Sequence, residues 1–408
     1  SRASGLWAAL KINTVVADGT ATAAVGARRI IPVIPQLEWE GKPYVHQPSG
    51  HLLPPESLEM ERTLHEIRLE LARCYARENG LNRVVQASPR ARVGVVVAGA
   101  SYYDLLEALG DLGIADRLRV LKLGMVYPLD GQVVRDFASG LDEIIVLEEK
   151  GPFLELLVKD ALYGSTHTPM VTGERDDRGR ALLPATGVLS PDAIARAIGS
   201  RLLLREDLPF VAARLAQMDA IARRSSVDVG QTRAPHFCSG CPHSASTKAP
   251  EDSIVGAGIG CHTMVLLNPS GRGRVLGATQ MGGEGAQWIG AAPFIAPRHF
   301  LQNLGDGTFH HSGSLAIRAA IAAGVHVTYK ILYNETVAMT GGQKPTGQMS
   351  VAAMARSLEA EGVKRIVITT TDVHRYDDVR LPALATVRDR SALAEVQLPG
   401  RRMELVAE

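Results

Sequence analysis

Apolar and polar residues alternate along residues 92–164 in a regular strand–helix order. Three short and nearly continuous apolar runs indicate buried strands, at Arg92–Ala98, Arg119–Leu123 and Asp142–Leu147. An apolar stripe with helical spacing follows each run, through Leu105, Leu106 and Leu109, around Val133–Ala138, and through Phe153–Leu162. Strands that alternate with helices predict a parallel sheet covered by helices.

The same alternation returns between residues 236 and 390. Phe300–Leu304 and Val327–Tyr333 are apolar runs typical of strands, and Ser312–Ala323 between them is a predicted helix that ends at Gly324. The sequence therefore predicts an α/β protein with two successive parallel-sheet domains. Gly173–Leu183 is expected to be a surface loop, Pro191–Leu203 a helix, and Glu206–Pro235 a helical linker with a polar end.

The first 80 residues carry one clear element. In Glu56–Asn79 the residues Met60, Leu64, Ile67, Leu71 and Cys74 form one apolar stripe, which predicts a helix with Cys74 as a buried thiol in its core-facing side. The segments before it are ambiguous: short strands or a helix end at Leu6–Leu10 and Val15–Ala24, and a proline-rich extended connector at Ile30–Pro55.

Composition excludes several classes of protein. The 44 Lys and Arg residues nearly balance the 43 Asp and Glu residues, so the net charge of +1 offers no basic surface for a nucleic acid. The longest apolar run, Val93–Ala100, is far shorter than a membrane span. Hydrophobic residues make up 46% of the chain, which is enough for sizeable cores in two or three domains.

One candidate site combines a Gly-Asp-Gly turn with an asparagine. Asp306, between Gly305 and Gly307, follows one predicted strand, and Asn334 follows the next. Both residues are therefore expected at the carboxyl edge of the sheet, where open α/β sheets bind ligands. Carboxylate and amide oxygens suit Mg²⁺, and the glycines and a following helix N-terminus suit a diphosphate. An ordinary turn is the alternative interpretation.

A second candidate site gathers three of the four cysteines. Cys238, Cys241 and Cys261 lie within one short stretch, and the first two form a C-x₂-C pair. The spacing suits Zn²⁺, with His243 and His262 completing the ligands, or an iron–sulfur cluster, and it leaves these two choices open. Three buried structural thiols are the third reading. Ligand thiolates predict a reducing compartment, the cytoplasm.

Several motifs together resemble a known family, the indolepyruvate:ferredoxin oxidoreductases, which are thiamine-diphosphate-dependent 2-oxoacid:ferredoxin oxidoreductases. They are Phe237–Pro242 (FCSGCP), Gly258–His262 (GIGCH), Thr279–Gly285 (TQMGGEG), Gly305–Gly313 (GDGTFHHSG) and Thr328–Gln343 (TYKILYNETVAMTGGQ). The resemblance implies a transketolase C-terminal-like domain followed by a diphosphate-binding domain.

The resemblance also assigns roles to residues. Asp306, Asn334 and the Thr336 carbonyl would bind Mg²⁺, and Gly305, Gly307 and Thr308 would approach the diphosphate. Cys238, Cys241 and Cys261 would hold a [4Fe–4S] cluster, one ligand short. The remaining polar residues of the motifs are expected to contact cofactor or substrate, or to support those that do: His243 and Gln343 at the cofactor, and Glu284, His310 and His311 in catalysis.

The implied activity is oxidative decarboxylation of a 2-oxo acid, such as the arylpyruvate indolepyruvate, to an acyl-coenzyme A, with electrons passing through the cluster to ferredoxin. The first alternative is a non-oxidative thiamine-diphosphate-dependent decarboxylase with structural cysteines. The second is a non-catalytic, Zn-stabilised fragment. The expected partners are the 2-oxo acid, coenzyme A, ferredoxin and further copies of the chain, with no nucleic acid and no membrane.

The resemblance further suggests an internal piece of a longer chain. Residues 1–91 would be a connector and helix from an upstream pyrimidine-binding domain, and 391–408 would begin a downstream domain that supplies the fourth cluster ligand. Between them, 92–204 would form the transketolase C-terminal-like domain, 205–235 a linker, and 236–390 the thiamine-diphosphate-binding domain. The upstream domain would supply the glutamate that activates the cofactor.

Overall fold

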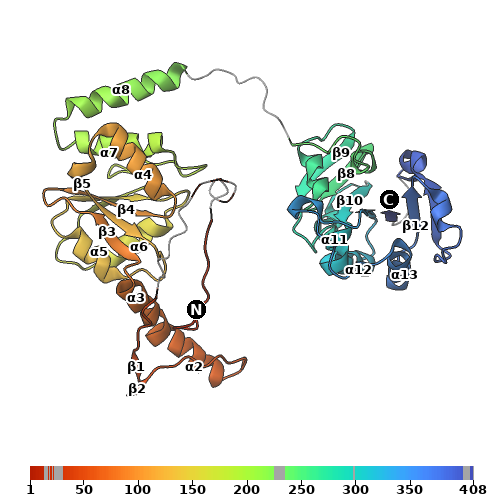
Figure 1. Cartoon of the computed structure of the whole chain (residues 1–408), viewed down its shortest axis with the longest axis horizontal. Coiled ribbons are helices and arrows are strands. Elements are labelled where there is room, and N and C mark those ends of the chain that lie inside the picture. The colour runs from red at the N-terminus through yellow and green to blue at the C-terminus, as the bar shows by residue number, and fades with distance from the viewer. Residues whose placement is uncertain are drawn as a thin grey trace. The chain divides into compact units, whose positions relative to one another are not determined.

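The computed structural model describes residues 1–12, 17, 19–20, 22, 31–224, 235–296, 299–397 and 405–407. The chain forms two compact units, Ser1–Asp228 and Val229–Glu408, each with its own cores (Figure 1). The predicted element at Val15–Ala24 lies mostly outside the described residues. In the part of the chain that the structure describes, no helix has the length and apolar character of a membrane span.

Unit 1 is built on a five-stranded sheet in the order β3-β5-β4-β6-β7. Pairs β4–β5, β4–β6 and β6–β7 are parallel, and only β3 runs antiparallel, against β5. The continuous burial of β4 and β6 explains their apolar sequences, because a parallel strand is covered on both faces. The strands are β3 (Asn82–Gln86), β4 (Val93–Ala98), β5 (Leu118–Leu123), β6 (Glu143–Leu147) and β7 (Met170–Thr172).

Helices cover both faces of this sheet (Figure 1). One core packs against α4, α7 and α8, and a second core packs against α5 and α6. Local signals set the helix ends: the Ser190 side chain caps α7 ahead of Pro191, and Gly113 ends α4 in the left-handed region. The helices are α4 (Ser101–Leu112), α5 (Gly131–Ala138), α6 (Phe153–Leu162), α7 (Pro191–Leu203) and α8 (Pro209–Arg224).

The first 80 residues agree with the sequence in one helix and differ elsewhere. The predicted helix exists as α2 (Glu56–Thr63), a π-helical turn Leu64–Arg68 and α3 (Leu69–Glu78). Leu6–Leu10 is neither strand nor helix, and its Trp7 and Leu10 side chains are exposed. The predicted connector contains a short hairpin of β1 (Glu38–Trp39) and β2 (Lys42–Pro43), joined through the positive-φ residues Glu40 and Gly41.

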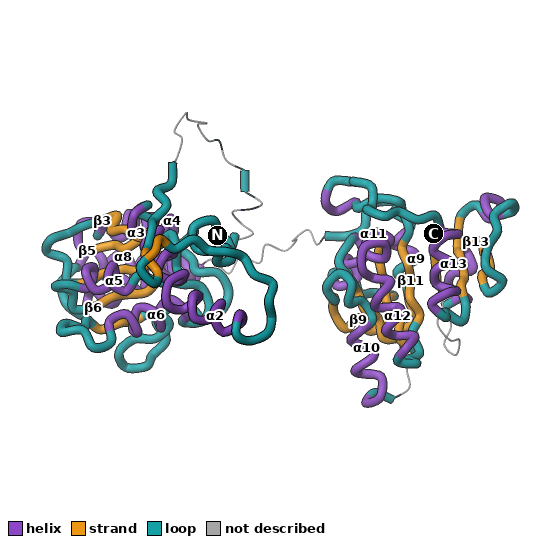
Figure 2. Tube along the Cα trace, turned by 90° about the horizontal axis from the view of Figure 1, so that it is seen from below, coloured by secondary structure: helices purple, strands orange, loops and turns teal. Residues whose placement is uncertain are grey.

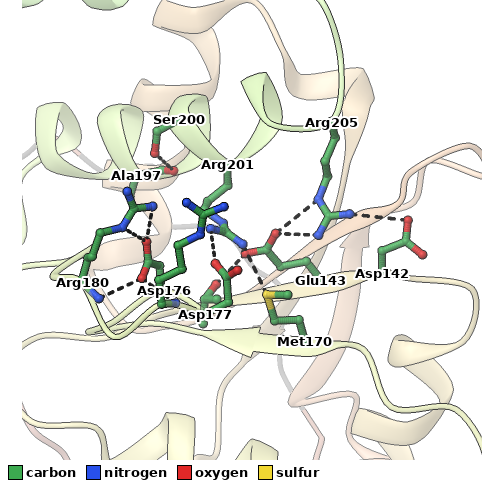
Figure 3. Close-up of polar contacts among 12 residues, drawn as sticks. Asp142, Glu143, Met170, Asp176, Asp177, Arg180, Ala197, Ser200, Arg201 and Arg205 are labelled. Carbon is green, nitrogen blue, oxygen red and sulfur yellow. Dashed lines mark hydrogen bonds and ion pairs between the residues drawn. The ribbon is translucent and has the colours of Figure 1, made fainter.

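A buried ion-pair network joins α7 to the sheet of unit 1 (Figure 3). The Glu143 carboxylate, fully buried at the start of β6, accepts from Arg201 at 2.7 Å and from Arg205 at 3.0 Å. It also accepts from the Thr172 hydroxyl of β7 at 2.8 Å. Arg201 reaches on to Asp177 at 2.7 Å, which fixes the loop after β7. Nothing in the local sequence pattern predicted this network.

Unit 2 is built on a seven-stranded sheet in the order β13-β12-β14-β11-β10-β8-β9, in which every pairing is parallel. The predicted fold class, α/β with two successive parallel-sheet domains, is thereby confirmed. The strands are β8 (Ala249–Ala257), β9 (Arg272–Ala278), β10 (Phe300–Gly305), β11 (Thr328–Leu332), β12 (Ile366–Thr370), β13 (Ala385–Asp389) and β14 (Leu405–Ala407). Strand β14, in the segment expected to begin a downstream domain, lies between β11 and β12.

The larger helices of unit 2 lie alongside the strands of its sheet (Figure 2). One large core packs α10 (Ala286–Ala291), α12 (Ser314–Ala322) and α13 (Val351–Glu361) against β10, β11 and β12. Smaller apolar clusters lie on the other side, near the 3₁₀ segment Cys261–Leu266 and α14 (Leu393–Val396). The short helices α9 (His243–Ser246) and α11 (Asp306–Thr308) belong to the candidate site.

Candidate functional site

The candidate site lies at the carboxyl ends of β8, β10 and β11. Strands β8 and β10 are neighbours, but the chain leaves β8 toward β9 at one edge and leaves β10 toward β11 on the other side. Such a reversal of strand order opens a crevice between the connecting loops, and open α/β sheets bind ligands there. The turn after β10 and the residue after β11, which the sequence predicted to form one site, both lie at this crevice.

Asp306 organises the crevice through its carboxylate. The side chain is 3% exposed, and its Oδ1 accepts from the Gly307 amide at 2.8 Å. Its Oδ2 accepts from the amides of Asn334 at 3.1 Å and Glu335 at 2.8 Å. One carboxylate therefore joins the end of β10 to the loop after β11. The Oδ1, which accepts from one amide only, keeps a lone pair for a further partner.

The loop after β11 lies at the crevice and contains a residue with a left-handed backbone conformation. Glu335 has φ of 58°, in the left-handed region that non-glycine residues seldom adopt. The neighbours Asn334 and Thr336 both line the pocket, and the Asn334 Oδ1 accepts from the Thr336 amide at 3.1 Å. Residues held in such conformations concentrate at functional sites. The loop therefore presents two oxygen-bearing residues beside Asp306.

A pocket of about 270 Å³ opens over these residues. Polar groups from the strand ends form one part of its wall, and apolar side chains form another. The predicted site residues that line it are His243, Cys261, Gly305, Asp306, Gly307, Thr308, His311, Asn334 and Thr336. The apolar lining comes from Ile259, Met281, Leu332, Val337, Ala338 and Met339. The arrangement suits a ligand with an anionic end and a less polar remainder.

Two buried histidines in the pocket wall have an unpartnered ring nitrogen. His243 is 4% exposed and His262 is 2% exposed, and neither Nε2 has a hydrogen-bond partner. Burial, and secondarily the nearby His243, lower the pKa of His262 to about 4, and burial also lowers the pKa of His243. Two neutral imidazoles therefore face the pocket with a nitrogen available to a ligand, since buried polar atoms normally have partners.

Glycines make room for His262. A Cβ on Gly258 would come within 2.8 Å of its Nε2, and a Cβ on Gly260 within 2.9 Å of its Cε1. Gly305 is the third glycine beside the ring, at 3.5 Å. From the sequence, His262 was expected only as a possible zinc ligand. The glycine spacing around Cys261 was the signal that a bulky side chain packs there.

Glu284 lies behind the pocket wall. It is fully buried, its Oε2 accepts from the Gly282 amide at 2.7 Å, and its Oε1 has no partner. The Oε1 would be 2.9 Å from a Cβ on Gly258, so Glu284 and His262 approach the same glycine. Burial raises the pKa of Glu284. The predicted catalytic role of this residue stays a prediction.

The remaining candidates divide by position. His310 follows the buried Phe309 in a π-helical turn, and both of its ring nitrogens are buried without partners away from the pocket lining. His311 does line the pocket, and its Nδ1 is 2.7 Å from the Ser312 hydroxyl. Gln343 is exposed outside the lining, where its Oε1 accepts from the Thr340 hydroxyl at 3.1 Å.

The three clustered cysteines lie near one another at one side of the pocket. Cys261 lines it, and burial followed by the charges of Cys241 and Cys238 raises the pKa of Cys261. Cys238 is exposed, and Cys241 is half-buried against Phe237 and Val265. Across the described ranges, no group of three or more His, Cys, Asp or Glu side chains is arranged to hold a metal ion. The fourth cysteine, Cys74, belongs to α3 of unit 1.

The buried Glu284 predicts a pH-dependent stability. Because its folded-state pKa is raised, the stabilising contribution of the protonated side chain is lost as pH rises through that pKa. We expect Glu284→Gln to match the wild type near pH 4 and to exceed its free energy of unfolding at pH 8. Urea denaturation followed by the fluorescence of the buried Trp288, with Trp7→Phe and Trp39→Phe in every chain compared, measures this difference.

The matched control for this experiment is Glu251→Gln, which removes an exposed carboxylate from β8. Its free energy of unfolding should follow the wild type at every pH. Parallel pH curves for Glu284→Gln and the wild type would contradict the assignment of a penalised buried charge.

Comparison with known proteins identifies the family to which this chain belongs. Residues 83–225 match the indolepyruvate oxidoreductase domain. Residues 258–377 match the C-terminal TPP-binding domain of thiamine pyrophosphate enzymes, and this range begins directly after β8 and contains the ends of β10 and β11. The chain belongs to the indolepyruvate oxidoreductase family. The family resemblance inferred from the sequence motifs is thereby confirmed.

Relatives in this family are named indolepyruvate oxidoreductase subunit IorA. The protein of Methanothermobacter thermautotrophicus is 30% identical over 307 residues, which are 72% of this chain and 46% of that protein. The protein of Archaeoglobus fulgidus is 28% identical over 323 residues, 76% of this chain and 47% of that protein. The chain therefore spans about half the length of these relatives.

Among solved structures, a 2-oxoglutarate:ferredoxin oxidoreductase from Magnetococcus marinus aligns with a TM-score of 0.33 and 15% identity. The alignment covers 43% of this chain and 64% of that one. A split-gene transketolase aligns with a TM-score of 0.25 and 24% identity, over 31% of this chain and 43% of that one.

Proposed function

We propose that this member of the indolepyruvate oxidoreductase family binds thiamine diphosphate and Mg²⁺ in the crevice between β8 and β10 and acts on 2-oxo acids. The observation that carries the proposal is Asp306: a buried carboxylate at the reversal of strand order, beside the oxygens of Asn334 and Thr336, within the matched TPP-binding domain. The donor set fits the cofactor. It supplies hard oxygens for Mg²⁺, and the unpartnered nitrogens of His243 and His262 are available to anionic oxygens.

The residues of the pocket have distinct tasks in this proposal. Thiamine diphosphate supplies the chemistry that labilises the bond between the carboxylate and the carbonyl carbon of a 2-oxo acid. Asp306, Asn334 and the Thr336 carbonyl hold Mg²⁺. The backbone at Gly307 and Thr308, at the start of the helical segment, would receive the diphosphate, because amides at a helix N-terminus favour negative charge. His311 and the apolar Met281 and Met339 also line the pocket, and they are proposed to lie on the side of the cofactor where the substrate binds.

The full reaction that we propose is oxidative decarboxylation of an arylpyruvate such as indolepyruvate to an acyl-coenzyme A, with ferredoxin as the electron acceptor. The names of the relatives and the less polar lining of the pocket support an apolar substrate side chain. Further copies of the chain and the remaining parts of the longer relatives are the proposed assembly partners. The proposed location is the cytoplasm.

The electron exit is proposed to be a [4Fe–4S] cluster on Cys238, Cys241 and Cys261. Burial, followed by the charges of Cys241 and Cys238, raises the pKa of Cys261, and this proximity supports the grouping of the three thiols. In the described arrangement they do not form a metal site, so the thiols have to approach one another to hold a cluster, and we derive no step through it. This observation favours one alternative, a non-oxidative 2-oxo acid decarboxylase with structural cysteines.

A titration tests the proposal. Thiamine diphosphate added to the chain should release heat in the presence of Mg²⁺, and the heat should disappear when EDTA replaces the metal. Thiamine without phosphate is the matched ligand control, and it should bind weakly because it lacks the anionic end. Equal binding of both ligands, or of neither, would contradict the proposed site.

A spectrum separates the two reaction types. After anaerobic reconstitution with iron and sulfide, an oxidative enzyme should show broad absorption near ~400 nm that depends on Cys238, Cys241 and Cys261. Thiamine diphosphate binding without that absorption would favour the non-oxidative decarboxylase.

A further inference from the structure

The segment that carries two of the cysteines is held by basic side chains from distant parts of unit 2. We define the thiol segment as residues 238–248, which include Cys238, Cys241, His243 and the short helix α9. Four of its backbone carbonyls accept hydrogen bonds from three basic side chains outside the segment. These side chains, named here the basic bracket, are Arg272, Lys330 and Arg390.

Lys330 is the central member of the basic bracket. It lies in the middle of β11, is 1% exposed, and its side chain points away from the core that contains Tyr329. Its Nζ donates to the carbonyls of Ser246 at 3.1 Å and Lys248 at 2.6 Å, and to the Gln397 Oε1 at 2.8 Å. All three acceptors are neutral oxygens. The ammonium therefore fixes the end of the thiol segment to a central strand.

The other two members bind the start and the middle of the segment. Arg272, 8% exposed at the start of β9, donates to the Ser244 carbonyl and to the Thr247 Oγ1, both at 3.2 Å. Its guanidinium also lies over the Phe237 ring, 5.4 Å from the centroid. Arg390, after β13, donates to the Pro242 carbonyl. The carbonyls at 242, 244, 246 and 248 are thus all bound from outside the segment.

This geometry connects the thiols to the cofactor pocket. The strand that carries Lys330 ends at Leu332, two residues before Asn334, and the helix that follows Pro242 places His243 in the pocket wall. A shift of the segment relative to β11 would therefore move His243 relative to Asn334 and would move Cys241 with it. The carbonyls at the end of a helix lack partners within it, so donors from elsewhere decide where that end lies.

Stability alone does not account for a buried lysine at this position. A buried cation costs free energy that an apolar residue of similar volume avoids, and such replacements are often neutral or stabilising. Burial, followed by the charge of Arg272, lowers the pKa of Lys330 to about 7, which reflects that cost. An apolar residue in β11 would pack against the segment without fixing the direction of its carbonyls.

We propose that Lys330 is a positioning residue, which through the basic bracket fixes the thiols of Cys238 and Cys241 and the imidazole of His243 against the pocket. The placement of the thiols stands on the contacts above. The consequence for the cofactor rests on the proposed function. Two separate measurements therefore test the two parts.

The first measurement is the rate of alkylation of each cysteine by iodoacetamide in the metal-free chain, resolved by peptide mass spectrometry. In Lys330→Met we expect the rate at Cys241 to rise at least about tenfold, because the unpaired carbonyls of Ser246 and Lys248 let the half-buried segment open. Cys74 in unit 1 is the internal reference and should react at its wild-type rate. The second measurement is thiamine diphosphate affinity in Mg²⁺, which we expect to weaken as His243 loses its place.

A stability-matched control separates positioning from general loosening. Leu358→Ala creates a cavity in the core of unit 2 on α13, away from the basic bracket. It should leave the Cys241 rate unchanged. Equal rates in Lys330→Met and the wild type, or an equal rise in Leu358→Ala, would overturn the proposal. Where Lys330→Met does not fold, Arg272→Gln removes the contact to Ser244 and should give the same pattern. Faster Cys241 alkylation with no cofactor binding in any variant would leave the bracket standing and reject the proposed function.

Discussion

Asp306→Ala is expected to weaken Mg²⁺-dependent binding of thiamine diphosphate by at least about a hundredfold. Mg²⁺ is held in phosphate sites by one or two carboxylates together with phosphate oxygens, and Asp306 is the carboxylate that lines this pocket. The substitution removes that ligand. It also frees the amides of Gly307, Asn334 and Glu335, so the loop after β11 loses its attachment to β10. Isothermal titration in Mg²⁺ measures the loss.

Asp306→Asn separates these two effects. An asparagine side chain keeps one carbonyl oxygen for the backbone amides but carries no charge for the metal. We expect it to retain the folded loop and still to lose most of the affinity. Folding of both variants is checked by the fluorescence of the buried Trp288, which belongs to the same unit.

Asp372→Ala is the matched control in the same sheet. Asp372 follows β12 and accepts from the His374 amide at 3.1 Å, and it lies outside the pocket lining. Its loss should leave cofactor affinity unchanged. Wild-type affinity in Asp306→Ala would remove Asp306 from the site, and an equal loss in Asp372→Ala would show that the effect arises from the sheet as a whole.

The sequence predicted four of the strands whose burial is continuous, although it did not predict the similarly buried β12. Strands β4, β6, β10 and β11 are covered on both faces, and their apolar runs identified them. Strand β13 escaped because it is an edge strand with an alternating, mostly exposed pattern. Strand β14 has three residues, too few for a pattern, although it pairs on both sides. Edge and very short strands depend on their neighbours rather than on their own composition.

The candidate site shows the same division between local and non-local information. Asp306 and Asn334 were found because parallel topology brings strand ends together, whatever the details of packing. Adjacent helical residues point in different directions, so of His310 and His311 only the latter lines the pocket. A sequence states that both histidines exist but not which one faces the crevice. The packing of His262 could not be predicted, because the glycines around its ring come from two different strand ends.

The network around Glu143 could not be predicted from the sequence, because it too depends on contacts between distant residues. Its arginines lie 58 and 62 residues further along the chain, and no periodic pattern connects them. From the sequence alone, a glutamate at the start of an apolar strand is expected to be exposed. Only the docking of α7 on the sheet buries it.

This network carries the second large expectation. We expect Glu143→Ala to lower the free energy of unfolding of unit 1 by about 3–5 kcal/mol, because it leaves the buried guanidinium of Arg201 without its main partner. The hydroxyl of Thr172 and one side of Arg205 lose their acceptor as well. Urea denaturation monitored by far-ultraviolet circular dichroism should show an earlier first transition. Trp288 fluorescence, measured with Trp7→Phe and Trp39→Phe in the background so that it reports unit 2 alone, should keep its midpoint.

Asp142→Asn provides the comparison that isolates burial as the cause. Asp142 is the preceding residue and also pairs with arginines, with Arg92 at 2.5 Å and with Arg205 at 3.7 Å, but its side chain is 35% exposed. Exposed pairs contribute at most about 1 kcal/mol and are screened by salt. The effect of Asp142→Asn on the free energy of unfolding should therefore be small. It should shrink further in about 0.5 to 1 M salt, because ionic strengths of that order shorten the Debye length to a few ångström. The effect of Glu143→Ala should persist there, because water and ions do not reach the buried carboxylate. Similar, salt-sensitive losses in both variants would mean that Glu143 is solvated in solution, and that α7 docks on the sheet through its apolar residues alone.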